Sequence, residues 1–298
     1  MARIKLLWQS KLVLLLVLPA VGANVVLWAH FWTIHSRPFV IWTIGLCALL
    51  GLVAWKLRSA TPWGAFAGTA ITASLMFSTA ELSPYEPWRT ALIPVLAVLV
   101  LTSIATRVGR TGKERLGLAE LRQGRAASQV AANLGIAALV SSEVVLSWII
   151  DSGWFGPHGI ASIPIFAPML AALAEAAADT VSSEIGQVFG GRPFLITTLR
   201  RVDAGTDGGI SLAGTFAGIL AAAIVAVLGA FTIFPGGLSM ALIAFAGGVF
   251  GLFFDSLLGA TIEQRGWLDN DLVNFLSTAS AAAFALLVMA LLPRPGAG

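Results

Sequence analysis

Long apolar runs, separated by short polar segments, dominate the pattern of the chain. A helix needs about 20 largely apolar residues to cross the hydrocarbon core of a bilayer. Nine runs approach that length, which predicts an all-α, polytopic membrane helical bundle of about nine transmembrane helices. The second run is short, so eight or ten helices remain as alternatives. The predicted spans are residues 12–31, 39–55, 62–80, 88–105, 129–150, 160–186, 210–234, 238–260 and 271–292.

Composition supports a membrane protein, and the basic residues predict its orientation. Only 11% of the residues are charged and 57% are hydrophobic, whereas about a quarter of the residues are charged in soluble domains. Lys and Arg concentrate in cytoplasmic loops, and a cytoplasmic N-terminus places 15 of the 18 Lys and Arg residues in such segments. We therefore expect an integral protein of a bacterial cytoplasmic membrane, and no nucleic-acid partner for its net charge of +3.

The chain contains no long linker or low-complexity tract, so we expect one integral membrane domain over residues 1–298. Residues 1–105 form its four-span N-terminal part, and residues 106–298 form the part that carries the site. Within the second part, the hydrophilic stretch 106–128 is expected to form an amphipathic surface helix. The single cysteine, Cys47, excludes a Cys-x-x-Cys metal site or a disulfide within one chain.

Three polar segments interrupt the apolar pattern in the second half of the chain. They are residues 179–184, residues 205–211, and the pair formed by residues 255–256 and 271–274. A carboxylate near the bilayer centre costs at least about 2.5 kcal/mol, so carboxylates kept there are candidates for function. In the nine-span topology all three segments meet the cytoplasm, which suits a site that takes a soluble substrate from that side.

The sixth predicted span carries an acidic stripe. Glu175, Asp179 and Ser183 recur every four residues and so share one face, whereas Glu184 points about 140° away from Asp179. Carboxylate oxygens suit Mg²⁺, which is usually held by one or two carboxylates together with substrate phosphates. The structural alternative is that these acids pair with arginines that fix the neighbouring loops.

A glycine-rich turn stands directly before the seventh span. Glycine lets backbone amides approach an anion closely, and the start of a helix adds unpaired N–H groups and the positive end of its dipole. Two preceding arginines add guanidinium groups that match phosphate oxygens. An ordinary turn with a helix cap at Asp207 or Ser211 is the structural alternative. The residues expected to bind phosphate are Arg200, Arg201, Gly205, Thr206, Gly208, Gly209 and Ser211.

The eighth and ninth spans add further polar residues. Asp255 falls between Gly251 and Gly259, in a span whose glycines allow close helix approach, so we expect it in a tightly packed seam. The ninth span begins with Asp271 and Asn274, and helix capping explains only one of these polar groups. Asn274 is expected to bind a polar substrate group. The catalytic candidates are Asp179, Glu184, Asp255 and Asp271, of which Asp179, Asp255 and Asp271 are the expected ligands of Mg²⁺.

On these motifs the chain resembles the integral membrane family that includes plant phytyl-phosphate kinases and the transmembrane protein 19 group. It is also similar to dolichol and phytol kinases, which use CTP or related nucleotides and carry a Lys-Ser-x-x-Gly-Ser pattern. Gly209 and Ile210 stand where that pattern has lysine, so arginines or Mg²⁺ would have to neutralise the phosphates. The segments that carry the resemblance include 117–120, 125–133, 178–186, 195–198, 205–215, 255–260 and 270–274.

The resemblance implies a membrane-embedded, Mg²⁺-dependent kinase. It would transfer a phosphoryl group from a nucleoside triphosphate, CTP or another, to an isoprenyl monophosphate such as phytyl or geranylgeranyl phosphate. The residue inventory agrees, because phosphoryl transfer needs mainly positioning and charge neutralisation. The alternatives are a polyprenol kinase or lipid cytidylyltransferase, an ion-coupled transporter, and a non-catalytic membrane protein. The expected partners are therefore the nucleotide, the isoprenyl phosphate lipid and the membrane.

Overall fold

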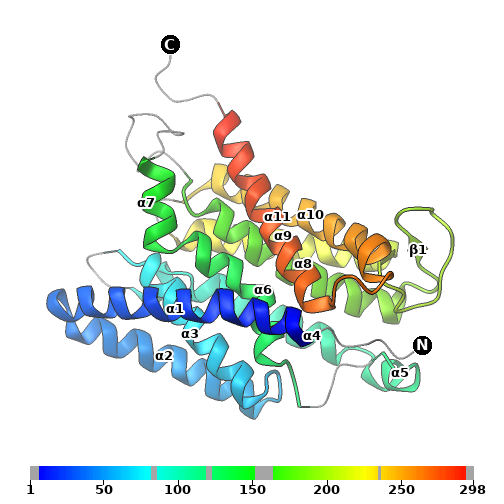
Figure 1. Cartoon of the computed structure of the whole chain (residues 1–298), viewed down its shortest axis with the longest axis horizontal. Coiled ribbons are helices and arrows are strands. Elements are labelled where there is room, and N and C mark those ends of the chain that lie inside the picture. Colours follow the sequence, from blue (N-terminus) through cyan, green and yellow to red (C-terminus); the bar gives the residue numbers. More distant parts are fainter. Residues whose placement is uncertain (1–6, 82–85, 119–122, 152–163, 234–235, 293–298) are drawn as a thin grey trace.

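The structure is a computed structural model, and helices make up nearly all of its regular secondary structure (Figure 1), which confirms the all-α class. It describes residues 7–81, 86–118, 123–151, 164–233 and 236–292. The elements are α1 Leu7–His35, α2 Arg37–Lys56, α3 Pro62–Ser78, η1 Pro87–Arg89, α4 Leu92–Arg107, α5 Arg110–Arg115, α6 Ala127–Val140, α7 Glu143–Asp151, α8 Ala167–Phe189, β1 Phe194–Leu195, β2 Gly209–Ile210, α9 Leu212–Thr232, α10 Leu238–Leu258, the π-helical turn η3 Gly259–Glu263, and α11 Asn270–Leu291.

Helix α8 is the central helix of the fold. It packs against α4, α6, α9, α10 and α11, and every residue from 167 to 178 is buried. Most of these residues are Ala or Leu, and small side chains let neighbouring helices approach closely. The acids of α8 therefore lie inside the protein instead of facing hydrocarbon, which is where ionisable groups are tolerated in a membrane.

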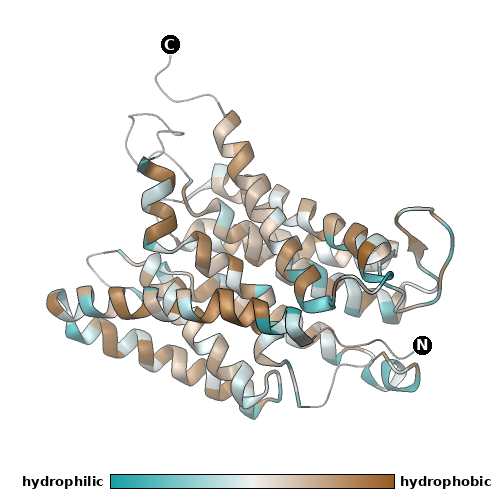
Figure 2. Ribbon diagram, in the orientation of Figure 1, coloured by the Kyte–Doolittle hydropathy of each residue, from teal (hydrophilic) through white to brown (hydrophobic). Residues whose placement is uncertain are grey.

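In the described part of the chain, five helices are long and apolar enough to cross a membrane: α1, α2, α9, α10 together with η3, and α11. Helices α6 and α7, bent by 43° at their junction, make a sixth candidate if they are counted as one span. Hydrophobic residues cover much of these helices (Figure 2). With 17 and 16 residues, α3 and α4 fall short of the usual length. The chain is thus a polytopic helical membrane protein, whereas nine helices and a cytoplasmic N-terminus stay predictions.

The predicted span over residues 129–150 consists of two helices, α6 and α7. At the junction the hydroxyl of Ser142 donates to the carbonyl oxygen of Leu139 at 2.6 Å, a local bond that competes with the regular helical ladder. The side chain of Asn24, from α1, accepts from the backbone N–H of Glu143 at 3.3 Å, at the start of α7. A tertiary contact therefore stabilises the break.

The predicted surface helix over residues 106–128 is replaced, in its described part, by the end of α4, the six-residue α5 and a turn. Residues 119–122 of that prediction lie outside the described part of the chain. After the turn, the backbone of Arg125 pairs with the segment before α3: its carbonyl oxygen accepts from Thr61 N at 2.9 Å, and its N–H donates to Ser59 O at 3.1 Å. The segment therefore joins α4 and α6 to the α2–α3 turn.

The polar segments gather at one end of the bundle, on the right in Figure 1, which we call the polar end. The start of α1 is fixed there, because Gln9 donates to Trp267 O at 2.8 Å and accepts from Asp269 N at 2.7 Å. The β1–β2 hairpin lies at the same end, where Gln264 donates to Asp207 O at 2.7 Å. The three predicted polar segments thus meet, and the assignment of this end to the cytoplasm stays a prediction.

Candidate functional site

An acidic cluster lies between α8 and α10. The side chain of Asp179, on α8, lies next to that of Asp255, on α10. Glu175 lies one turn before Asp179, and Ser277 of α11 lies beside both Glu175 and Asp255. We call Glu175, Asp179 and Asp255 the acidic cluster. Two of the predicted catalytic residues, distant in the sequence, are therefore in direct contact.

The acidic cluster is only partly exposed, since Glu175 is buried and Asp179 and Asp255 are half-buried. Glu175 is only 1% exposed. Within the part of the chain that the structure describes, Oε1 of Glu175 and Oδ2 of Asp255 are buried and have no hydrogen-bond partner. Unpaired buried carboxylate oxygens are costly, and neighbouring like charges add to that cost. The folded protein must offset it with bound protons or a cation, so this cluster is the strongest candidate for a functional site.

Helix α10 packs tightly on α8 and α11 at Gly251, one turn before Asp255. A Cβ atom at this position would lie 2.5 Å from Cγ of Glu175 and 3.0 Å from the carbonyl oxygen of Ser277. Neither neighbour can give way easily in a packed interior, so glycine is required here. The predicted seam around Asp255 is confirmed, and it fixes the spacing of the helices that carry the acidic cluster.

Arg125 places a positive charge beside the acidic cluster. It lies just before α6, and its guanidinium attracts the carboxylate of Asp179. The same group is 3.3 Å from Oγ1 of Thr102 and 3.5 Å from Oγ1 of Thr180. The sequence prediction used Arg125 only as a topology signal and as part of a family motif. Its position directly before an apolar helix was the signal for a role in the site.

A buried ion pair joins α5 to α8. Lys113 is 1% exposed, its Nζ is paired with the carboxylate of Glu184, and it also donates to the carbonyl oxygens of Ala105 at 3.2 Å and Thr106 at 3.0 Å. The sequence prediction assigned Lys113 to membrane topology and Glu184 to catalysis. The structure gives Glu184 a pairing partner that fastens α5, and a catalytic role for Glu184 stays a prediction.

The glycine-rich turn packs on the end of α10, next to the acidic cluster. At Gly208, where φ is +72°, a Cβ atom would lie 2.4 Å from Cβ of Ala260 and 2.5 Å from the carbonyl oxygen of Ser256. The hydroxyl of Ser211 caps α9 by accepting from Gly214 N at 3.1 Å. This is the helix cap that the sequence analysis gave as the alternative to a phosphate site. The turn therefore has a structural role, and its backbone also lies close to Ser256, the residue that follows Asp255.

Some of the predicted phosphate-binding groups of this turn are used inside it. The hydroxyl of Thr206 donates to Asp203 O at 2.8 Å, and the N–H of Gly209 donates to Thr206 O at 2.9 Å. Gly205 is in the left-handed region, with φ of +83°, a conformation that glycine adopts without strain. The remaining amides of the turn are its candidates for phosphate contacts.

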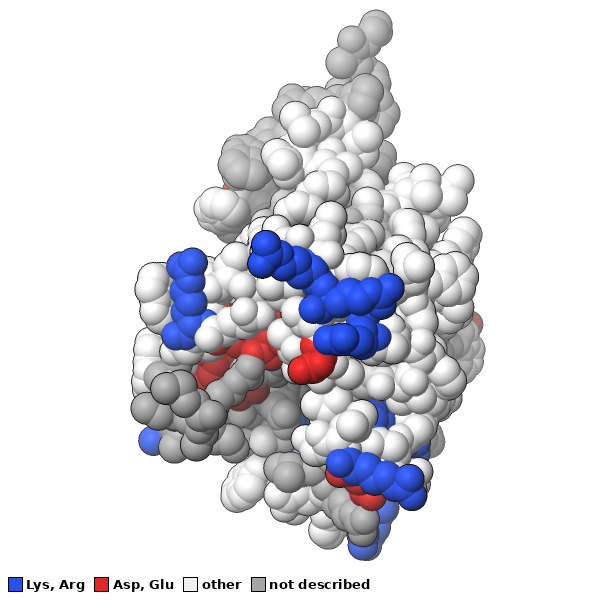
Figure 3. Space-filling view, turned by 90° about the vertical axis from the view of Figure 1, so that its right-hand side faces the viewer, with Lys and Arg blue, Asp and Glu red and all other residues white. Residues whose placement is uncertain are grey.

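Arg200 and Arg201 lie on the exposed surface of the β1–β2 hairpin. The guanidinium of Arg201 stacks 4.7 Å above the ring of Phe194 and donates to Arg192 O at 3.2 Å. Figure 3 views the polar end and shows Asp and Glu side chains inside a hollow, with Lys and Arg side chains on its rim. The two arginines are thus placed at the surface, where a soluble anion can reach them.

Asp271 and Asn274 lie on the first turns of α11. Asp269 caps this helix by accepting from Leu272 N at 2.9 Å, whereas Asp271 accepts from Ser10 Oγ of α1 at 2.7 Å. Asn274 is half-buried, and its carbonyl oxygen accepts from the hydroxyl of Ser277, the neighbour of the acidic cluster.

The three predicted metal ligands are not assembled as a group. Among the residues that the structure describes, no set of three His, Cys, Asp or Glu side chains has the arrangement of a metal site. Asp179 and Asp255 come together, and Asp271 is instead bonded to α1. Any cation at the acidic cluster therefore has to take further ligands from a bound substrate or from water.

Fold and site together define a polytopic helical membrane protein with a buried acidic cluster at one end of its bundle. The family model of integral membrane protein DUF92 matches residues 45–282. The chain therefore belongs to this family of integral membrane proteins. The match starts within α2 and ends within α11, so it includes the acidic cluster, Arg125 and most of the four-span N-terminal part. No solved structure matches the chain.

Several curated proteins are similar to the chain. An uncharacterized membrane protein of Synechocystis is 32% identical over 253 residues, which cover 81% of this chain and 86% of that protein. An uncharacterized membrane protein of Methanocaldococcus jannaschii is 39% identical over 119 residues, 40% of this chain and 49% of its own length. The chloroplastic protein VTE6 of Arabidopsis thaliana is 30% identical over 199 residues, 65% of this chain and 57% of VTE6.

Proposed function

We propose that this protein is a membrane-embedded kinase that transfers a phosphoryl group from a nucleoside triphosphate to an isoprenyl monophosphate. The observation that carries the proposal is the contact between Asp179 and Asp255, with buried carboxylate oxygens that lack partners, next to a glycine-rich turn. The similarity to VTE6 supports a prenyl-phosphate kinase-like role, and the motif resemblance to the family of plant phytyl-phosphate kinases supplies the substrate class.

The proposed reaction needs no catalytic base. One oxygen of the acceptor phosphate forms a bond to the γ-phosphorus of the nucleotide, while the bond from that phosphorus to the β–γ bridging oxygen breaks. The products are an isoprenyl diphosphate and a nucleoside diphosphate. Because the acceptor oxygen is already anionic, the protein has to position two anions and neutralise their charge.

The residues of the acidic cluster fit Mg²⁺. This ion is usually held by one or two carboxylates, and substrate phosphates complete its coordination. Asp179 and Asp255 would hold it, and the buried, unpartnered Oδ2 of Asp255 supplies a free ligand atom. When bound, the ion would neutralise negative charge on the phosphates that react.

The other site residues have proposed roles in positioning. Arg125, beside Asp179, would contact the acceptor phosphate, since guanidinium groups bind phosphate oxygens through two parallel hydrogen bonds. The glycine-rich turn would hold the donor phosphates, with Arg200 and Arg201 contacting them from the hairpin surface. Asn274 would bind a polar group of the substrate.

The test is a reconstituted assay with purified protein in nanodiscs. Geranylgeranyl or phytyl monophosphate is supplied with Mg²⁺ and each of the four common nucleoside triphosphates, and lipid diphosphate and nucleoside diphosphate are quantified together. We expect equal amounts of the two products with at least one nucleotide. Absence of lipid diphosphate with every nucleotide and both lipids would reject the kinase.

Matched variants assign the activity to the acidic cluster. Asp255→Asn removes a ligand charge from the cluster, and we expect the rate to fall by about a hundredfold or more, as when an essential charge-stabilising group is lost. Asp203→Asn is the control, because the side chain of Asp203 is 94% exposed and pairs only loosely with Arg192, at 3.8 Å. Equal activity of the two variants would contradict the assignment of the site.

Product identity separates the kinase from reactions that use the same substrates or related ones. A lipid cytidylyltransferase would release pyrophosphate and form a CDP-lipid, and a polyprenol kinase would phosphorylate the alcohol.

Burial of the acidic cluster in the bundle also favours an ion-coupled transporter as a second candidate, because buried carboxylates relay protons in such proteins. Proton movement in proteoliposomes without any nucleotide would favour that candidate.

A further inference from the structure

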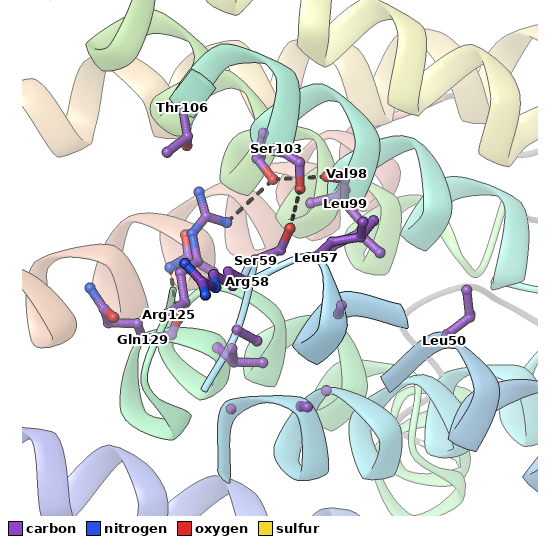
Figure 4. Close-up of a pocket in the computed structure, with 18 of the residues that line it drawn as sticks. Leu50, Leu57, Arg58, Ser59, Val98, Leu99, Ser103, Thr106, Arg125 and Gln129 are labelled. Atoms are coloured by element: carbon purple, nitrogen blue, oxygen red, sulfur yellow. Dashed lines mark hydrogen bonds between the residues drawn. The ribbon is translucent and has the colours of Figure 1, made fainter. Parts of the chain in front are cut away.

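A cavity of about 560 Å³ lies in the N-terminal half of the protein, between α2, α3, α4 and α6 (Figure 4). This volume is in the usual range of small-molecule sites, about 300–1,000 Å³. One part of the cavity is apolar and is lined by side chains such as Cys47, Leu50, Leu96 and Leu99. The cavity is therefore shaped for a ligand with a hydrocarbon part.

The other part of the cavity is polar and positively charged. Four arginines line it, and Glu114 is the one acid among the described lining residues. Glu114 is paired with Arg110 at 3.2 Å, so no described lining acid balances Arg58 and Arg107, while Arg125 faces the carboxylate of Asp179. Figure 4 shows Arg58 and Arg125 on the same side of the cavity, near Ser59, Ser103 and Gln129. Three arginines beside an apolar chamber suit an amphiphile with an anionic head.

One arginine of this rim, Arg107, is held in place by the protein. Arg107 donates to Leu57 O at 2.9 Å and to Ser103 O at 3.1 Å, which ties α4 to the α2–α3 turn. Arg58, by contrast, has φ of +56° and a guanidinium that bonds to nothing within the described residues. A left-handed backbone is uncommon for arginine and is maintained only where its surroundings enforce it. Arg58 is thus the rim arginine most available to a ligand.

The cavity reaches the acidic cluster through Arg125 and α8. Ala176 lines the cavity and directly follows Glu175 in the chain. Arg125 also lines it, and the same guanidinium attracts Asp179 and lies 3.5 Å from Oγ1 of Thr180. An anionic head bound by Arg125 would therefore lie next to the proposed phosphoryl-transfer site.

We infer that this cavity binds the acceptor lipid, a single-chain isoprenyl monophosphate, with its tail in the apolar part and its phosphate on Arg58, Arg107 and Arg125. The inference rests on the proposed function for the identity of the substrate, but the cavity and its charge are independent of it. It assigns a role to the N-terminal helices α2, α3 and α4, as the lipid-binding half of the site. The opposite half, α8 to α11, holds the acids and the glycine-rich turn.

The test measures binding and not turnover, so it can succeed or fail independently of the kinase. Radiolabelled geranylgeranyl monophosphate is titrated onto the full chain in phosphatidylcholine nanodiscs without nucleotide or Mg²⁺. Leu50→Trp fills the apolar part of the cavity, and its neighbour Leu49→Trp is the matched control, because Leu49 is 55% exposed on the same helix. We expect Kd to rise by about tenfold or more for Leu50→Trp and to change by less than about twofold for Leu49→Trp.

A second pair of variants tests the head group and remains informative if Leu50→Trp does not fold. Arg58→Gln should raise Kd by about tenfold, the usual effect of losing a charge-assisted hydrogen bond. Arg115→Gln, an exposed arginine of α5 outside the cavity, should leave it unchanged. Competition identifies the ligand: unlabelled isoprenyl monophosphate should displace the label, whereas geranylgeraniol, inorganic phosphate and phosphatidic acid should displace it poorly.

Each outcome decides one claim. Equal Kd values for wild type, Leu50→Trp and Arg58→Gln would overturn the cavity assignment, even if diphosphate is formed. Displacement by phosphatidic acid as strong as by the isoprenyl phosphate would overturn the single-chain ligand in favour of a phospholipid. Specific binding that both variants weaken, in a protein that forms no diphosphate with any nucleotide, would support the cavity and reject the kinase.

Discussion

The buried ion pair between Lys113 and Glu184 predicts a large and specific loss of stability. Lys113→Met removes the ammonium but keeps an apolar side chain of similar length, and it leaves Glu184 buried without its partner. The side chains are only 1% and 11% exposed, so water cannot replace the lost contact easily. Breaking a buried pair by removing one partner costs about 3–5 kcal/mol, and Lys113 also donates to two carbonyl oxygens at the end of α4.

The control and the rescue are both available on the same two helices. Arg110→Met breaks an i,i+4 pair with Glu114 in which both side chains are about a third exposed, and such pairs contribute less than about 1 kcal/mol. Adding Glu184→Gln to Lys113→Met removes the orphaned charge, so the double variant should recover part of the lost free energy of unfolding.

The assay is reversible unfolding in mixed micelles with increasing sodium dodecyl sulfate, followed by circular dichroism. We expect Lys113→Met to lower the free energy of unfolding by about 3 kcal/mol or more, and Arg110→Met to lower it by less than about 1 kcal/mol. Equal effects of the two single variants, or a double variant no more stable than Lys113→Met alone, would refute the reasoning. In that case Lys113 would be solvated in the native protein.

Two further variants test the geometry of the site. Gly251→Val should lower the melting temperature and abolish activity, because even its Cβ would lie 2.5 Å from Cγ of Glu175. The control Gly45→Val has open space around it and should keep the melting temperature and the activity of the wild type. A stable, active Gly251→Val would contradict the tight seam. Asp271→Asn should reduce the rate of diphosphate formation by less than about tenfold, since the side chain of Asp271 is hydrogen-bonded to Ser10 of α1. If Asp271→Asn lowered the rate as much as Asp255→Asn, Asp271 would have to be a catalytic residue.

Hydropathy predicted the last three helices of the chain closely, whereas the expected span 160–186 corresponds to α8 at 167–189. The expected spans 210–234, 238–260 and 271–292 differ by about two residues or fewer at each end from α9, from α10 and from α11. These helices have long apolar runs bounded by glycine, proline or a capping acid, so length and turn residues alone locate them. The polar segments between them also met where the topology required.

Interactions between distant segments set the features that the sequence did not reveal. In the run of residues 129–150 the polar triplet 141–143 is the local mark of the break, and the contact from Asn24 of α1 that stabilises it cannot be read from that run. Likewise Lys113 has the character of an ordinary surface lysine in its local sequence, and only the packing of α5 on α8 explains its burial. Of the predicted site residues, Asp179 on α8 and Asp255 on α10 lie together inside the bundle. Asp271 is instead hydrogen-bonded to Ser10 of α1, a partner that spacing does not disclose.

The composition of α8 has a consequence for biogenesis. With three carboxylates in 23 residues, α8 is not among the helices apolar enough to partition into a bilayer unaided, because each acid near a helix centre opposes translocon insertion by about 2.5–3.5 kcal/mol. Its stable insertion therefore depends on helices synthesised after it, since α9, α10 and α11 cover its surface. A ribosome that stalls before α11 would leave this segment exposed to quality-control proteases.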